Sequence, residues 1–513
     1  MNTVSDPFRC VLPDLRHLGM SFVITLLYGT AALILAAFGF WELRMLVHFL
    51  RNRDAIRGTS SEEPVRPVST DAIDPPTVTI QIPLYNERTA AEQIIRAASA
   101  QDYPHDRFDV QVLDDSTDET PQIVAKVVEE VRATGIRIEH LRRDNRQGYK
   151  AGALAEGLER STSELVAVFD ADFVPEPGFL RRLVLEARAF DDPAIAFVQA
   201  RWAWGSAVEG WLPSALALLL DRHFRVQKPT RAFSGSVTTF NGSGGIWRRE
   251  AIDSAGGWTS DTLTEDLDLS YRCALDGWRG RYLADVMVQN ELPGHMRAFK
   301  LQQRRWSRGS AQCFRKLTGR VMSAGKVVRH RWDEAFMLAG YAIHPLLLAS
   351  LILWPWAVLY VDRTLFWVLQ GFMSLGIVAA MLSFMITVHE RGEPWSLGTL
   401  VRVVVSLCVG MGLMVNNTVG QIQGFTTSGG EFVRTPKQKR VSTDGAMAAL
   451  GAGRAYSSPL HWTFFAEVLV MAYCVAGAAL LIQQGEGLWS LAMLFWGACL
   501  GLMVQQQMAQ SLA

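Results

Sequence analysis

The long apolar stretches of this chain lie toward its two ends and leave its middle free of them, which restricts the possible folds strongly. The first, from Leu18 to Trp41, is long enough to cross a bilayer as a helix and too long for the apolar part of a cleavable signal peptide. Four more follow residue 330: Phe336–Val361, Leu365–Val388, Thr463–Ile482 and Leu488–Met508. We therefore expect an integral membrane protein with a folded domain between its spans.

The composition agrees with this division and excludes two classes of partner or site. Charged residues make up 19% of the chain and hydrophobic residues 49%, which suits a soluble domain joined to a helical bundle. The 50 acidic and 50 basic residues balance, so we expect no nucleic-acid partner. The six cysteines lie far apart, without the spacing of zinc ligands or of a disulfide framework, and are expected to be reduced thiols.

Charges beside the first span predict its orientation. Four arginines follow it between residues 44 and 57, whereas only Arg9 and Arg16 precede it. By the positive-inside rule, the chain after the span is cytoplasmic, and in a bacterium the membrane would be the plasma (inner) membrane. We expect an N-terminal span and flank at 1–57, a linker at 58–76, a cytoplasmic domain with interfacial helices at 77–330 and a C-terminal transmembrane bundle at 331–513.

Residues 398–424 do not read as a simple span. A single crossing would put the basic stretch Arg434–Arg440 outside, against the positive-inside rule. The segment also carries four side-chain amides: Asn416, Asn417, Gln421 and Gln423. We therefore expect an interfacial, re-entrant or pore-lining helix here, with the loop at 425–459 on the cytoplasmic side.

The middle of the chain alternates short β-branched runs with helix-like stretches. The expected strands are Thr77–Tyr85, Phe108–Asp115, Ile136–Leu141, Leu165–Asp172 and Ala194–Trp202, with helices at Ala90–Ala100, Thr120–Thr134 and Ala151–Arg160. This alternation predicts an α/β domain with a mostly parallel sheet. Several of the apolar runs end in acidic residues, and ligands bind such sheets at the carboxyl ends of the strands.

Three acidic motifs are candidates for a site. Asp170 and Asp172 end an apolar run, so both can reach one hard cation and its bound phosphates, although such pairs also occur by chance on surfaces. Asp115 could accept hydrogen bonds from a nucleotide or could be a turn acid. Glu265 and Asp266 follow Thr264 and could supply a general base, be the first turn of a capped helix, or both.

A basic stretch from Arg297 to Arg315 contains Gln302, Arg305 and Trp306. One interpretation is an amphipathic helix on anionic lipid headgroups. The other is that arginine and glutamine bind a leaving diphosphate while tryptophan stacks on a sugar ring.

Taken in order, these motifs resemble those of the family-2 processive glycosyltransferases over roughly residues 75–315. The matching segments are Gln81-Ile-Pro-Leu-Tyr-Asn-Glu87, Gln111-Val-Leu-Asp-Asp-Ser-Thr-Asp118, Arg143-Asp-Asn-Arg-Gln-Gly-Tyr-Lys-Ala-Gly-Ala153, Phe169-Asp-Ala-Asp-Phe173, Gln199-Ala-Arg-Trp202, Phe240-Asn-Gly-Ser-Gly-Gly-Ile-Trp247, Thr264-Glu-Asp266 and Gln302-Gln-Arg-Arg-Trp306. The variants are most similar to cellulose-synthase-like mannan and glucan synthases and to bacterial cellulose synthase catalytic subunits.

The resemblance implies a GT-A domain, a metal-dependent inverting hexosyltransferase and a role for each motif. It implies that Asp170 and Asp172 hold Mg²⁺ or Mn²⁺ and that Asp266 is the catalytic base. The nucleotide-sugar contacts that it implies are Glu87, Asp115, Lys150, Asp170, Gln302 and Arg305; the acceptor contacts are Trp306 and Glu265. Phe432, Thr435 and Lys437 are similar to a gating loop that closes over the donor; the alternative is a basic juxtamembrane loop.

The resemblance leaves the donor and the acceptor open. UDP-glucose and GDP-mannose are both possible donors, and the expected product is a β-glucan, β-mannan or glucomannan that is translocated across the membrane. The alternative is a single-transfer lipid glycosyltransferase acting on ceramide or diacylglycerol. A transporter whose soluble domain only binds nucleotide would leave the acidic motifs and Gln302–Trp306 unexplained.

Overall fold

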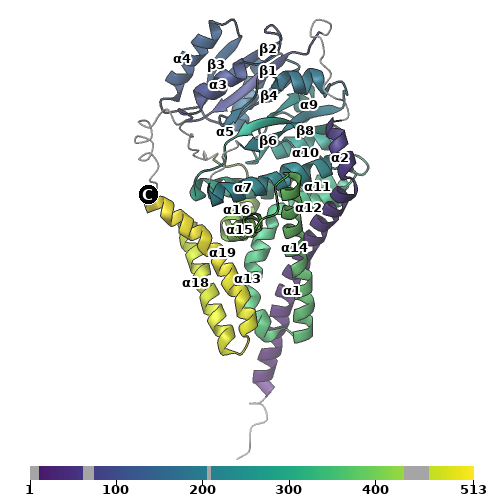
Figure 1. The fold of residues 1–513 in the computed structure, drawn as a ribbon, viewed down its shortest axis with the longest axis vertical. Coiled ribbons are helices and arrows are strands. Elements are labelled where there is room, and N and C mark those ends of the chain that lie inside the picture. The colour runs from purple at the N-terminus through teal and green to yellow at the C-terminus, as the bar shows by residue number, and fades with distance from the viewer. Residues whose placement is uncertain (1–10, 62–73, 205–209, 432–460, 513) are drawn as a thin grey trace, which may run out of the picture.

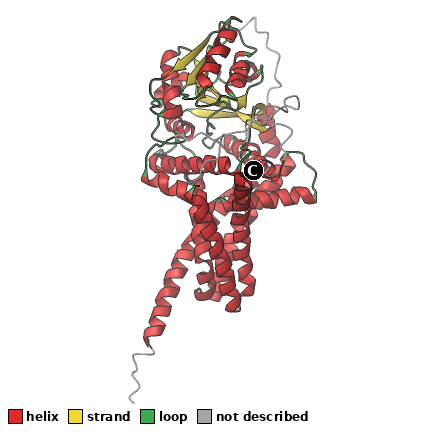
Figure 2. Ribbon diagram, turned by 90° about the vertical axis from the view of Figure 1, so that its left-hand side faces the viewer, coloured by secondary structure: helices red, strands yellow, loops and turns green. Residues whose placement is uncertain are grey.

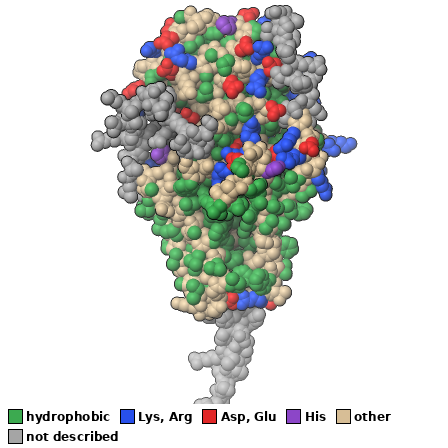
Figure 3. Space-filling view, viewed as in Figure 1, with side chains coloured by type: hydrophobic (Ala, Val, Ile, Leu, Met, Phe, Trp, Pro, Cys, Tyr) green, Lys and Arg blue, Asp and Glu red, His purple; other side chains and the backbone are tan. Residues whose placement is uncertain are grey.

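The computed structural model describes residues 11–61, 74–204, 210–431 and 461–512, and it contains an α/β domain joined to a bundle of long helices (Figure 1). All strands lie at one end of the molecule, and the long helices extend away from them (Figure 2). The face seen in Figure 3 carries a broad apolar belt over these helices, with charged side chains above and below it. This arrangement matches the expected division into a folded domain and spans.

Within the described residues, five helices are long and apolar enough to cross a membrane. They are α1 (Val11–Arg51), α13 (Ile343–Tyr360), α14 (Arg363–Glu390), α18 (Trp462–Gln483) and α19 (Gly487–Leu512). The expected spans are therefore present, but the second starts later than predicted. Helix α12 (Arg331–Leu338) ends first, and a 3₁₀ turn at Gly340–Ala342 leads into α13. Pro345 explains the break, because it has no N–H to donate to the carbonyl of Tyr341.

The segment predicted to be unusual forms two helices, α15 (Leu397–Gly412) and α16 (Met414–Thr426), which are bent by 41° relative to each other. Both lie between the α/β domain and the long helices (Figure 1). Helix α16 packs along α11 (Met296–Ser323), and α15 packs on α19 and α7 (Trp211–Asp221). The bend agrees with the expectation that residues 398–424 do not form a simple straight span.

The sheet has eight strands in the order β3-β2-β1-β4-β7-β6-β8-β5. Their bounds are β1 Val78–Leu84, β2 Phe108–Asp114, β3 Ile138–Arg142, β4 Leu165–Val168, β5 Phe173–Val174, β6 Ile195–Trp204, β7 Gly245–Arg248 and β8 Arg279–Asn290. β3, β2, β1 and β4 are parallel, β7 is antiparallel to both neighbours, and β6 and β8 are parallel. The expectation of a mixed, mostly parallel sheet is confirmed, and the five predicted strands are all present.

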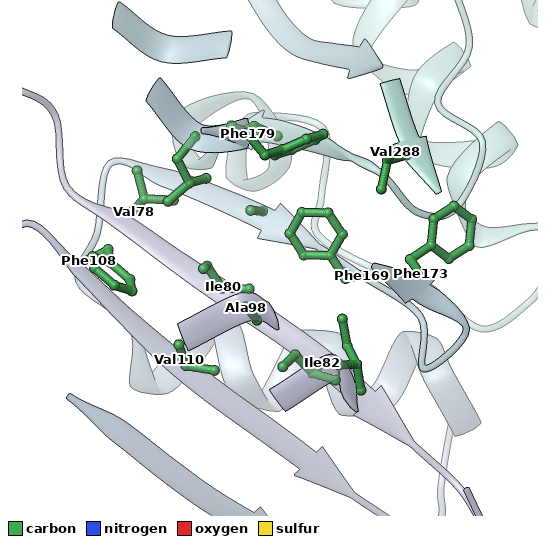
Figure 4. Packing of buried hydrophobic residues seen from close by; sticks show 14 of the residues in the cluster. Val78, Ile80, Ile82, Ala98, Phe108, Val110, Phe169, Phe173, Phe179 and Val288 are labelled. Atoms are coloured by element: carbon green, nitrogen blue, oxygen red, sulfur yellow. The ribbon is translucent and has the colours of Figure 1, made fainter. Parts of the chain in front are cut away.

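Helices cover both faces of the sheet. One face packs on α3 (Ala91–Ser99) and α4 (Thr120–Arg132), the other on α5 (Tyr149–Arg160) and α9 (Arg249–Ser254). Val78, Ile80 and Ile82 of β1 point to the first face, where Phe108 and Phe169 join them (Figure 4). Fully burying each such side chain contributes about 1.5–3 kcal/mol. Successive side chains of a strand point to opposite faces of the sheet, so burial of these residues fixes the direction in which the residues at the strand end point.

The remaining helical elements outside the long helices are short. They are α2 (Arg53–Ser61), α6 (Phe179–Arg181), η2 (Arg182–Glu186), η3 (Arg222–Gln227), α8 (Lys228–Ser234) and α10 (Glu265–Leu275). Of these, η3 and α10, together with α7 and α11, lie at the junction where the candidate site is found.

Candidate active site

A cavity of about 750 Å³ lies where the α/β domain meets the helices. It is lined by the ends of strands on one side and by α1, α13, α14 and α15 on the other. Every predicted site residue within the described chain lines it: Glu87, Asp115, Lys150, Asp170, Asp172, Glu265, Asp266, Gln302, Arg305 and Trp306. The structure therefore brings together motifs that are more than 200 residues apart in sequence. The predicted gating residues Phe432, Thr435 and Lys437 lie outside the described residues.

The two aspartates at the end of β2 have different surroundings. Asp114 is buried, lies 2.9 Å from Nε2 of His140 through its Oδ2, and accepts a hydrogen bond from the backbone of Ser116. Burial alone would raise the pKa of Asp114, but these two partners lower it overall. Asp115 lines the cavity, and Nε of Arg143 donates to its Oδ1 over 2.8 Å. Asp115 is thus the member of the pair that can meet a ligand.

An aromatic ring and a guanidinium stack beside Asp115. The guanidinium carbon of Arg146 lies 3.2 Å from the centre of the Tyr85 ring, and both residues line the cavity with Glu87. Asn86, which stands between Tyr85 and Glu87 in the sequence, has φ 57°, and its side chain accepts a hydrogen bond from the backbone N–H of Thr117. A flat stacked surface next to carboxylates is suited to a nucleobase and its ribose.

Lys150 joins the Asp-Ala-Asp segment to the base motif. Its Nζ lies 2.6 Å from Oδ1 of Asp170 and 3.5 Å from Oε1 of Glu265, and it donates to the carbonyl of Gly242 over 2.9 Å. Burial alone would lower the pKa of Lys150, but the two carboxylates raise it above its ordinary value. The lysine therefore stays protonated and holds the two acidic motifs at a fixed separation.

The described residues offer few acidic side chains for binding a metal ion. Among the described residues, no group of three or more histidine, cysteine, aspartate or glutamate side chains is arranged to hold a metal. Asp170 and Asp172 follow β4 and both line the cavity. Mg²⁺ and similar ions take one or two protein carboxylates and complete their shell with phosphate oxygens and water. The residues present fit a cation of that kind.

Asp266 lies in the first turn of α10, and its surroundings favour proton transfer near neutral pH. Burial, followed by the charge of Glu265, raises the pKa of Asp266 to about 7, although Lys150 opposes this. A general base is most effective when its pKa is close to the working pH. Thr264 stands at the N-cap position of α10 and the two acids lie in its first turn, as the helix interpretation expected. The Thr264 side chain, however, makes no capping hydrogen bond, and its Oγ1 contacts Sγ of Cys313 instead.

Helix α11 presents Gln302, Arg305 and Trp306 to the cavity. Burial lowers the pKa of Arg305, and the carboxylates of Glu265 and Asp170 oppose that shift. Most residues from Ser307 to Cys313 are buried between the α/β domain and the helices. This disfavours the interpretation in which the basic stretch lies on lipid headgroups.

Sequence reasoning missed three residues that border the site: Arg143, His223 and Asn241. Oδ1 of Asn241 accepts from Lys228, and its Nδ2 lies 3.4 Å from Nε2 of His223. Burial and the nearby charge of Lys228 lower the pKa of His223 to about 3, so it is neutral and can only donate or accept hydrogen bonds. Arg143 and Asn241 stand in motifs that were recognised without a role for them. His223 stands in none, and no sequence signal pointed to it.

The amides of α16 do not line the cavity, whereas Ser406, Leu407, Gly410 and Met411 of α15 do, so only the first part of the segment 398–424 lines it. Asn416, Asn417 and Gln421 are buried and hydrogen-bonded to α11 or α13. Aromatic residues and one histidine line the part of the cavity between the helices: Phe38, Trp41, Phe336, Tyr341, His344, Phe384 and Phe495.

Comparisons with known proteins agree on the α/β domain. The family model described as glycosyltransferase like family 2 matches residues 75–309. Glucomannan 4-beta-mannosyltransferase 2 of Arabidopsis thaliana is 43% identical over 270 residues, which are 52% of this chain and 50% of that protein. Glucomannan 4-beta-mannosyltransferase 1 of Oryza sativa subsp. japonica is 39% identical over 295 residues, which are 57% and 56%. The chain spans about half the length of these relatives.

Among solved structures, the mannosyltransferase PcManGT from Pyrobaculum calidifontis, in complex with GDP-Man and Mn²⁺, has a TM-score of 0.50. It is 21% identical, and the match covers 74% of this chain and 98% of that chain. This likeness shows the fold, and the predicted GT-A type of α/β domain between long apolar helices is confirmed.

Proposed function

We propose that this membrane protein is an inverting glycosyltransferase of family 2, the family whose model matches residues 75–309, and that it extends a β-linked mannan or glucomannan from GDP-mannose. One observation carries the proposal: a single cavity is lined by the strand-end acids, by Asp266 of α10 and by the arginine and tryptophan of α11. The relatives at about 40% identity are named as glucomannan mannosyltransferases, which favours mannose over glucose.

The nucleotide would lie along the ends of β1 and β2. Asp115, fixed by Arg143, and Glu87 would accept hydrogen bonds from the base and the ribose beside the stacked Tyr85 and Arg146. Carboxylates accept from the N–H groups of guanine and from hydroxyls alike. The pocket is thus compatible with a guanosine donor.

The diphosphate would lie between α11 and the end of β4. Arg305 and Gln302 would donate hydrogen bonds to its oxygens, and Arg305 would neutralise the charge that develops as it leaves. Asp170 and Asp172 would hold Mg²⁺ or Mn²⁺, which when bound supplies further neutralisation of the diphosphate.

The acceptor would be held by Trp306 and Glu265, with its reacting hydroxyl on Asp266. Asp266 would accept the hydroxyl proton while the oxygen bonds to the anomeric carbon of the donor. The bond from that carbon to the diphosphate oxygen breaks at the same time, and the nucleoside diphosphate leaves with the electron pair. Attack from the face opposite the leaving group converts an α-linked donor into a β-linked product.

The growing chain would leave through the helical part of the cavity. That part is lined by aromatic side chains from α1, α12, α14 and α19, including Trp41 and Phe336, whose rings stack with centroids 6.1 Å apart. Sugar rings pack on such aromatic faces. This favours a polymer over a single sugar on a lipid. The arginines after the first span favour a cytoplasmic catalytic domain.

The test is to incubate the purified, detergent-solubilised protein with labelled GDP-mannose or UDP-glucose and Mn²⁺, and then to digest the product. We expect label from GDP-mannose in a polymer that an endo-β-mannanase cleaves. A single labelled sugar on an organic-extractable lipid would overturn the polymer, and incorporation from UDP-glucose alone would overturn mannose. Binding of nucleotide without any transfer would overturn the enzyme itself.

A further inference from the structure

A buried ion pair ties the catalytic helix α11 to two of the apolar helices. Nζ of Lys300 lies 2.5 Å from Oε2 of Glu467 on α18 and donates to Oε1 of Gln507 on α19 over 2.8 Å. The two charged side chains are 5% and 0% exposed. Ionisable residues inside a membrane bundle are costly and are retained where they have a specific task.

Arg304 repeats this arrangement one helical turn later. Its guanidinium donates to Oδ1 of Asn416 on α16 over 3.0 Å and to Oγ1 of Thr463 on α18 over 3.2 Å. It also lies 2.9 Å from Nε2 of His461, at the start of α18. Nδ2 of Asn416 donates to the carbonyl of Lys300, which closes the network over 2.9 Å. Residues four apart share one face of a helix, so this whole face of α11 is attached to the bundle.

The helix backbones themselves are in close contact. A Cβ atom at Gly420 of α16 would stand 2.8 Å from the carbonyl oxygen of Arg304, and one at Gly424 would stand 2.4 Å from that of Arg308. The first N–H of α11, on Met296, donates to Oε1 of Gln510 on α19 over 2.7 Å. α11 is therefore fixed along its length and at its start by α16, α18 and α19.

Arg304 immediately precedes the two residues that the proposed reaction needs from α11. Successive residues of a helix are about 100° apart, so while Arg304 points to the bundle, Arg305 and Trp306 point to the cavity. Any rotation or slide of α11 would move both together. We propose that Lys300 and Arg304 are positioning residues that hold α11 so that Trp306 presents the acceptor to Asp266. This inference rests on the proposed function.

The test compares Arg304→Met and Glu467→Gln with Arg304→Lys and with Arg320→Met. Arg320 is an exposed residue near the end of the same helix and serves as the matched control. We expect the first two variants to lower kcat for glycosyl transfer about tenfold or more. The KM for the donor should rise by a smaller factor, because Gln302 and Arg305 would shift with α11 whereas Asp115, Asp170 and Asp172 are on other elements. A larger share of the donor should be hydrolysed by water, since the acceptor is displaced. Arg304→Lys should recover part of the loss.

Two results would overturn the inference: kinetics like those of Arg320→Met, or a loss of transfer with an unchanged share of hydrolysis. Hydrogen exchange gives a reading that needs no activity. In Arg304→Met, the backbone amides of residues 296–308 should exchange faster than in the wild type, and those of the sheet at the wild-type rate. Unchanged exchange in α11 would also contradict the positioning role. Transfer by the wild-type protein in the same assay tests the proposed function separately.

Discussion

At the scale of single residues, the environment of Asp266 connects structure to reaction. Burial in the cavity wall and the neighbouring carboxylate of Glu265 disfavour its charged form, while Lys150 favours it. The balance leaves a base that is neither permanently ionised nor too weakly acidic to ionise at pH 7. Glu265, held 3.5 Å from Nζ of Lys150, thus raises the pKa of the proposed base.

The pH dependence of kcat/KM should report this balance. If Asp266 is the base as proposed, transfer needs its deprotonated form, so kcat/KM should rise with pH through a limb whose midpoint is about 7. Glu265→Gln removes the like charge, so it should lower the pKa of Asp266 and move the limb to lower pH, whatever it does to the maximal rate. Rates measured between about pH 5 and 9 would check this. A limb that stays in place or moves upward in Glu265→Gln would contradict the assignment.

The sequence was informative about site residues where chemistry requires a fixed spacing. Asp170 and Asp172 were found because a strand end and a two-residue spacing suffice to place both carboxylates on one ion. His223 was missed because it reaches the cavity through η3, a π-helical turn that no local pattern predicts. The pKa of Asp266 could not be predicted from the sequence either, because the burial that raises it is a property of the assembled cavity.

At the scale of elements, the sheet was the most predictable part. Alternation and β-branched content located both ends of β1, β2, β3, β4 and β6 to within four residues, the largest difference being at the end of β4. Strands β5, β7 and β8 were not predicted, and of these β7 and β5 are only four and two residues long and owe their pairing to neighbours. The break before α13 depends on one proline in an otherwise apolar run.

Gly157 in α5 shows how tightly a helix packs on this sheet. A Cβ there would stand 2.6 Å from Nε2 of Gln81 and 2.8 Å from Oε1 of Gln111, both buried. We expect Gly157→Ala to destabilise the protein by about 1–3 kcal/mol through overpacking, although alanine favours helices by about 1 kcal/mol.

The matched control is Gly319→Ala in α11, where a Cβ would meet nothing within 4 Å. It should be neutral or stabilising. Thermal unfolding of the two variants in detergent would check the comparison. Equal stability of both would show that α5 does not pack on the sheet as described.

At the scale of the whole molecule, the cavity belongs to neither half alone. Strand ends supply its charged side, and α1, α13, α14 and α15 supply its apolar side. The sequence predicted each half from local patterns, but no local pattern shows that Trp41 of α1 lines the same cavity as residues of the α/β domain. The same holds for the amides of α16, which serve packing on α11 rather than the cavity.

If the product leaves between the helices, the aromatic residues there should affect its length. We expect Trp41→Ala to shorten the polymer, because a stacking surface in the exit path is lost, while the initial rate of transfer changes less than about threefold. Trp395→Ala, at an exposed tryptophan away from the cavity, is the control. Product size would be measured by gel filtration after release. Normal length in Trp41→Ala would place the exit elsewhere.

The central claim is that this cavity transfers mannose with Asp266 as the base. The most direct measurement is the initial rate of label incorporation from GDP-mannose by Asp266→Asn against the wild type, with nucleotide affinity measured as a check on folding. The expected result is a loss of about 10²–10⁴-fold with near-normal nucleotide binding. A variant that binds nucleotide and makes polymer at the wild-type rate would contradict it.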